Sequence, residues 1–70
     1  MIEFSLGNHE FIELHNLLKV VGVVHSGGVA KALIANGEVI VDGNVELRKR
    51  CKIRVGQVIQ FQDEKIRVLE

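Results

Sequence analysis

The chain has 70 residues, 47% of them apolar, with nine basic and nine acidic residues and one cysteine. This length allows one hydrophobic core, so we expect a single domain over residues 1–70, and a lone cysteine excludes an internal disulfide and a cysteine-rich zinc site. No apolar run approaches the roughly 20 residues that span a bilayer, and no basic secretion signal opens the chain, which favours a cytoplasmic protein without a membrane partner.

The first predicted elements are a strand and two helices. Apolar and polar residues alternate over residues 2–6, which is the period of a strand with one buried face. Apolar residues then recur at helical spacing over residues 14–21, and Gly22 suits the end of that helix. A second helix is predicted after Ser26, whose hydroxyl can cap the first turn, and it ends at Asn36-Gly37.

The second half of the chain predicts strands. Residues 39–41 and 44–47 flank Asp42-Gly43, a strong two-residue hairpin signal, although a longer loop through Asn44 would give the other register. Further alternation predicts strands over residues 51–55, 58–61 and 65–69, the last of which could pair with the first strand. We therefore expect an α+β fold with two short helices packed on a small, mostly antiparallel sheet.

Charge is distributed unevenly along the chain. Residues 1–18 carry a net charge of −3 and residues 19–54 a net charge of +4. Five cations fall within seven residues, namely Arg48, Lys49, Arg50, Lys52 and Arg54. In an extended segment, the side chains at positions 48, 50, 52 and 54 would share one face, with Cys51 and Ile53 packed inward. Such a face favours RNA phosphate as a ligand, and the alternative is a solvated strand edge.

The start of the second helix is a second candidate phosphate site. Ser26 is followed by Gly27 and Gly28, which leave the backbone N–H groups of a first helical turn accessible to a phosphate oxygen. Lys31 lies one turn further along the helix. The alternative is a plain serine cap with glycines for close packing, and the spacing is not that of a P-loop.

Catalysis and base stacking are not expected. The sequence has no paired carboxylates, nucleophile–base pair or nucleotide fingerprint, and its three histidines lack metal-site spacing, so we expect no enzyme, metal or cofactor. Phe4, Phe11 and Phe61 fall at positions typical of a core, which leaves no aromatic platform for single-stranded bases. Phosphate contacts with folded or double-stranded RNA are therefore favoured.

Residues 12–61 resemble a known RNA-binding family. The motif residues are Leu17-Leu18-Lys19, Gly22, Ser26-Gly27-Gly28-Val29-Ala30-Lys31 and Gly37-Glu38-Val39-Ile40-Val41-Asp42-Gly43. In this order and spacing they are similar to the RNA-binding domain named for ribosomal small-subunit protein S-four, and most of all to its small stand-alone bacterial members. The resemblance implies an αL-type RNA-binding fold that contacts RNA through the second helix and the hairpin region.

The chain departs from the family pattern at several positions. The family usually has arginine where Gly27 stands, and a basic residue where residues 12–14 read Ile-Glu-Leu. Asp42 replaces the usual asparagine, and Gln57 replaces the usual aspartate. The first two departures remove cations that the family uses on RNA, and the basic residues at positions 31 and 48–54 could compensate.

We therefore expect a monomeric, non-catalytic module that binds structured ribosomal or transfer RNA. The expected RNA contacts are Ser26, Gly27, Lys31, Arg48, Lys49, Arg50, Lys52 and Arg54. The alternative is an adaptor that binds an RNA enzyme or a ribosome-associated protein through its apolar or acidic face. The acidic residues 1–18 support that alternative.

Overall fold

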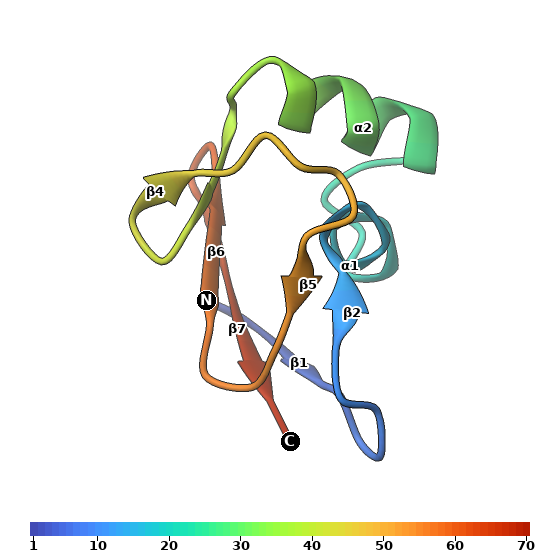
Figure 1. Ribbon diagram of the computed structural model, residues 1–70, viewed down its shortest axis with the longest axis vertical. Helices are drawn as coiled ribbons and strands as arrows, with labels where there is room; N and C mark the ends of the chain where they lie inside the picture. Colours follow the sequence, from blue (N-terminus) through green and yellow to red (C-terminus); the bar gives the residue numbers. More distant parts are fainter.

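A computed structural model describes residues 1–70 and shows two helices, a five-stranded sheet and a two-stranded ladder (Figure 1). The helices are α1 (Leu14–Val20) and α2 (Gly27–Ala35). The strands are β1 (Ile2–Ser5), β2 (Ile12–Glu13), β3 (Val39–Val41), β4 (Asn44–Val45), β5 (Lys52–Ile53), β6 (Val58–Phe61) and β7 (Glu64–Leu69). The main sheet has the order β1-β7-β6-β3-β4, and β2 pairs with β5. The predicted α+β class is confirmed.

The two terminal strands lie side by side, as the sequence predicted. β1 runs parallel to β7, with Ile2 paired to Ile66. The pairing continues beyond the strand, because the Leu6 N–H donates to the Leu69 carbonyl at 2.8 Å. All other strand pairs are antiparallel, so the sheet is mixed only at this edge.

The hairpin between β3 and β4 has the shorter of the two loops that the sequence left open. Val41 pairs with Asn44, so only Asp42 and Gly43 form the turn. Both have positive φ, 50° and 86° respectively, as the favoured two-residue hairpin turn requires. β4 is shorter than the predicted return strand, and beyond it Leu47 is 61% exposed.

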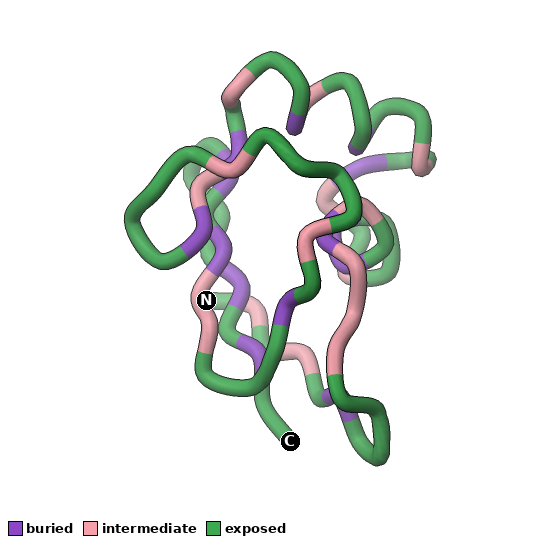
Figure 2. Tube along the Cα trace, in the orientation of Figure 1, coloured by how far each residue is buried: buried purple, intermediate pink, exposed green.

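The core lies between the helices and the main sheet. Leu14, Leu17 and Leu18 of α1 and Ala30 and Ile34 of α2 are completely buried. Figure 2 shows buried positions on both helices and on the central strands of the sheet. All 14 buried residues are hydrophobic, so every charged side chain remains at least partly in solvent. Neither helix has the length and apolar composition needed to cross a membrane.

Candidate nucleic-acid interface

Residues 48–54, here called the basic segment, do not form the extended strand that the sequence predicted. The Cys51 N–H donates to the Arg48 carbonyl at 3.1 Å, which closes a turn over residues 48–51. Regular strand geometry is confined to Lys52 and Ile53. The prediction that four alternate cations share one face is therefore wrong.

The basic segment bends because its carbonyl groups cap the start of α1. No side chain caps this helix, although the first N–H groups of any helix need partners. Instead, the Leu14 N–H donates to the Cys51 carbonyl at 2.9 Å, and the His15 N–H donates to the Lys49 carbonyl at 3.0 Å. The backbone of the turn is thereby held in place, while the Lys49 and Arg50 side chains remain exposed.

Arg48 is exposed but is neutralised by a neighbour. Its Nε lies 2.9 Å from Glu46 Oε2 and its Nη2 lies 3.1 Å from Glu46 Oε1. The Glu46 carboxylate also accepts from the Arg48 backbone N–H at 3.0 Å. These bonds lower the pKa of Glu46 to about 2 and raise the pKa of Arg48. The other four cations of the basic segment have no carboxylate within 4.0 Å.

Phe11 lies on the outer face of the β2–β5 ladder. The prediction that Phe11 belongs to the core is therefore wrong. Ile12 pairs with Ile53 and Glu13 with Lys52, so this register places Phe11 opposite Arg54. Lys52 Nζ lies 5.0 Å from the centre of the Phe11 ring, and Arg54 Cζ lies 5.7 Å from it. The ring is only half-buried, so the cations have an aromatic neighbour that remains partly open to solvent.

Cys51 is half-buried and packs against the core, as the alternation with Ile53 predicted. Burial is the main cause that raises the pKa of its thiol, and the Glu46 carboxylate adds to the effect. Val55, by contrast, is 49% exposed, because β5 ends at Ile53 and the chain turns at Gly56, which has φ 90°.

The start of α2 has the predicted serine cap. Ser26 Oγ accepts from the Val29 N–H at 3.2 Å, and the helix begins at Gly27. A methyl group added to Gly27 would meet no atom within 4 Å, so this glycine does not serve close packing. The space beside the first turn is open, and Lys31 is exposed one turn further on.

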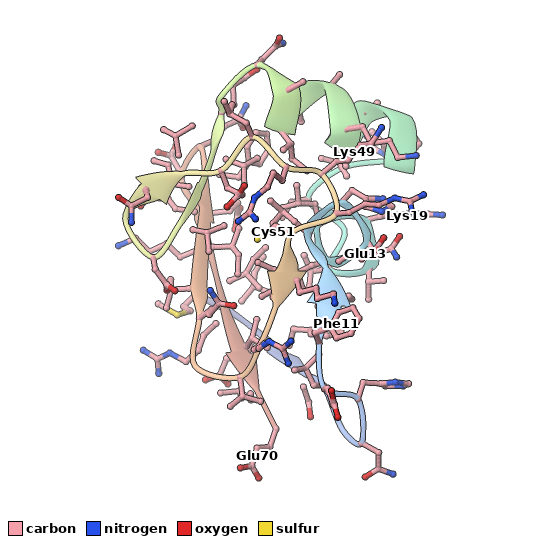
Figure 3. All side chains as sticks on the ribbon, viewed as in Figure 1. Phe11, Glu13, Lys19, Lys49, Cys51 and Glu70 are labelled. Carbon is pink, nitrogen blue, oxygen red and sulfur yellow. The ribbon has the colours of Figure 1, made fainter.

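Two features near this surface were not predicted from the sequence. Lys19, an exposed residue in the last turn of α1, lies on the same side of the molecule as Lys49 in Figure 3. Lys19 is the only Lys or Arg of α1, and this isolated cation was the feature of the sequence that could have pointed to it. His15, on α1, has a side chain only 12% exposed, and its Nε2 lies 2.8 Å from Glu13 Oε1.

Comparisons with known proteins agree in one family. A family model described as S4 domain matches residues 4–69. The chain is 51% identical over 69 residues to YbcJ of Escherichia coli (strain K12) and, to the same extent, to YbcJ of Shigella flexneri. Each alignment covers 99% of this chain and 99% of the relative. The chain is also 36% identical over 53 residues to the Bacillus subtilis (strain 168) protein RlbA, which is named as a probable ribosome maturation protein. This alignment covers 76% of this chain and 75% of RlbA.

One solved structure has the same fold. The solution structure of YbcJ from E. coli, described as revealing an αL motif involved in RNA binding, matches with a TM-score of 0.78 at 50% identity. The match covers 100% of this chain and 89% of that chain. The predicted resemblance to small bacterial members of the family is confirmed.

Proposed function

Because the chain belongs to the S4 domain family, we propose that residues 1–70 form one monomeric, non-catalytic module that binds structured RNA in the cytoplasm. The solved relative is described as carrying a motif involved in RNA binding, and another relative is named for ribosome maturation. Ribosomal RNA is accordingly the first target to test, and transfer RNA is the second.

The observation that carries this proposal is the anchoring of the basic segment. Its backbone carbonyls are bonded to the start of α1, so no side chain is needed to hold the turn in place. Four side chains are left to contact phosphates, those of Lys49, Arg50, Lys52 and Arg54. Phosphate contacts of this kind position a protein on RNA without reading its sequence.

The remaining proposed contacts have smaller roles. Lys31 adds a cation on α2, and Ser26 and Gly27 present the open first turn of that helix to a phosphate oxygen. Arg48 contributes less than its neighbours, because Glu46 already offsets its charge. The site therefore consists of a main contact in the basic segment and a secondary contact on α2.

A salt titration with a ribosomal RNA fragment or a tRNA tests the proposal. If about four phosphates are neutralised, the logarithm of the association constant should fall against the logarithm of salt concentration with a slope of roughly −3 to −4. An affinity that does not change with salt would overturn the phosphate contacts.

The second candidate function is that of an adaptor for an RNA enzyme or a ribosome-associated protein. One structural feature favours it: β4 is a free edge of the main sheet, and Val45 and Leu47 are 58% and 61% exposed there. Crosslinking in cells separates the two functions. Recovery of a protein partner with no bound RNA would support the adaptor.

A further inference from the structure

One surface hollow is lined in part by Phe11, Glu13 and Asn16. We propose that this hollow binds an unpaired nucleobase, so that the protein prefers RNA in which an unpaired nucleotide adjoins a helix. This inference rests on the proposed RNA-binding function and adds a preferred class of RNA to it. The phosphate contacts cannot supply such a preference by themselves, because they carry no direct information about bases.

Phe11 adjoins both the hollow and two cations. The ring lines the hollow, whereas Lys52 and Arg54 lie beside the ring but do not line the hollow. A nucleotide that places its base in the hollow would therefore place its own or the next phosphate near the two cations. Nonspecific binders of single strands use the same combination of an aromatic ring for the base and cations for the backbone.

The hollow suits a flat, partly polar group in size and in chemistry. Its volume is about 560 Å³, within the range of small-molecule sites. Its lining includes Phe4, Leu6 and Phe11 as apolar surfaces and His9, Glu13 and Asn16 as polar groups. The apolar side chains can contact the faces of a base, while the polar ones can bond its edge.

Glu13 gives the lining of the hollow a hydrogen-bond acceptor. One of its oxygens lies 2.8 Å from His15 Nε2, which fixes the carboxylate and leaves the second oxygen as an acceptor. Figure 3 shows Glu13 and Phe11 on the same side of the molecule, with Glu13 in β2 and Phe11 immediately before that strand. An acceptor beside an aromatic ring fits the amino group of adenine, guanine or cytosine.

A ligand for this surface must combine a flat group for Phe11 with an anion for Lys52 and Arg54. A nucleotide has both, whereas a basic peptide would meet two like charges at the ring. The chemistry of the surface therefore favours an RNA nucleotide over a basic peptide segment.

The test compares two RNA hairpins that share one stem. In the first hairpin, a single 2-aminopurine is bulged from the stem, and in the second hairpin it is base-paired. The protein has no Trp or Tyr, so the probe can be followed by its own fluorescence. We expect about tenfold tighter binding of the bulged hairpin, from the usual contribution of one stacked base, and a change in probe emission on binding.

Phe11→Leu should remove most of this preference while leaving the paired hairpin bound, and Phe11→Tyr, which keeps the ring, should retain it. Asn16→Leu is an independent variant, because it narrows the hollow from an exposed position on α1 and leaves the ladder intact. It too should reduce the preference, which keeps the proposal testable if Phe11→Leu fails to fold.

Equal, salt-dependent binding of both hairpins by the unmodified protein would overturn the base site and leave the proposed RNA-binding function standing. Failure to bind either hairpin would overturn both proposals. A preference that survives Phe11→Leu and Asn16→Leu would also overturn the base site, since it would have to originate elsewhere.

Discussion

Asp42 and Gln57 are hydrogen-bonded to each other, with 3.0 Å between Oδ2 and Nε2. Asp42 also accepts from the Val58 N–H at 2.9 Å, and Gln57 accepts from the Arg54 N–H at 2.8 Å. The resemblance described above implies asparagine and aspartate at these two positions. In this chain the two departures form one unit, because the Asp42 carboxylate accepts a hydrogen bond from the Gln57 amide.

The first prediction is that Asp42→Asn destabilises the protein and that adding Gln57→Glu restores most of the loss. Asparagine tolerates the positive φ of position 42, so the backbone is not the cause. Its amide group would face the Gln57 amide, donor against donor, at a cost of about 1 kcal/mol. Urea unfolding of both single variants and the double variant measures the coupling, and additive losses would contradict it.

The second prediction is that acid lowers stability through Asp42 and Glu46. The Val58 N–H and then Gln57 lower the pKa of Asp42, and Arg48 lowers the pKa of Glu46 to about 2. Because the pKa of each carboxyl group is lower in the folded protein than in the unfolded chain, each group stabilises the fold. This contribution is fully present above the ordinary pKa of the group, which is 3.8 for Asp42 and 4.5 for Glu46. This stability is lost as the pH falls toward about 2.

Thermal melts between pH 5 and pH 2 measure this loss, in a range below the ordinary titration of histidine. Asp42→Asn should show a smaller fall in melting temperature than the unmodified protein, because one of the two carboxylates is gone. An identical pH profile in the two proteins would show that Asp42 does not contribute.

Structural features that depend only on neighbouring residues were predictable from the sequence. The Ser26 cap and the Asp42-Gly43 turn are local, and their chemistry is visible in two or three positions. The shape of the basic segment could not be predicted in this way. Its bend serves the N–H groups of Leu14 and His15, which are more than 30 positions away in the chain.

The environment of Phe11 was missed for a related reason. It depends on the pairing of β2 with β5, and each of these strands has only two residues. Two residues are too few to give a periodic signal, so the apolar character of Phe11 alone decided the prediction that it lies in the core. The cations of the proposed site could be named from the sequence as candidates, whereas the aromatic ring beside Lys52 and Arg54 could not.

The third prediction concerns the basic segment. Replacing Arg50, Lys52 and Arg54 together with Gln should weaken RNA binding to a similar extent for different RNA sequences, because the contacts are to phosphates. The free energy of unfolding should change by no more than about 1 kcal/mol, which allows for the lost contacts of two cations with Phe11.

A matched control removes two exposed cations from β7, with Lys65→Gln and Arg67→Gln. This control should weaken binding much less than the triple variant, although it also lowers the net charge. Arg48→Gln is a second comparison and should weaken binding less than Arg50→Gln, because Glu46 already neutralises Arg48. Losses that follow only the number of cations removed, wherever they lie, would mean that overall charge, rather than the basic segment, governs binding.

The fourth prediction is that Cys51 reacts slowly with a thiol reagent at neutral pH. Its half-buried position limits access, and its raised pKa lowers the fraction of the reactive thiolate. We expect labelling of the folded protein to be at least about tenfold slower than labelling in denaturant. Equal rates would show that the thiol faces solvent.

The place of β7 between β1 and β6 has a consequence for how the chain folds during synthesis. It is the last strand in the sequence, yet it is the sole partner of β1, which is the first. The first strand therefore has nothing to pair with until residues 64–69 have been made, and β6 keeps an open edge until then. The main sheet cannot be completed before β7 is available, so the edges of β1 and β6 remain unpaired, and open to other chains, until then.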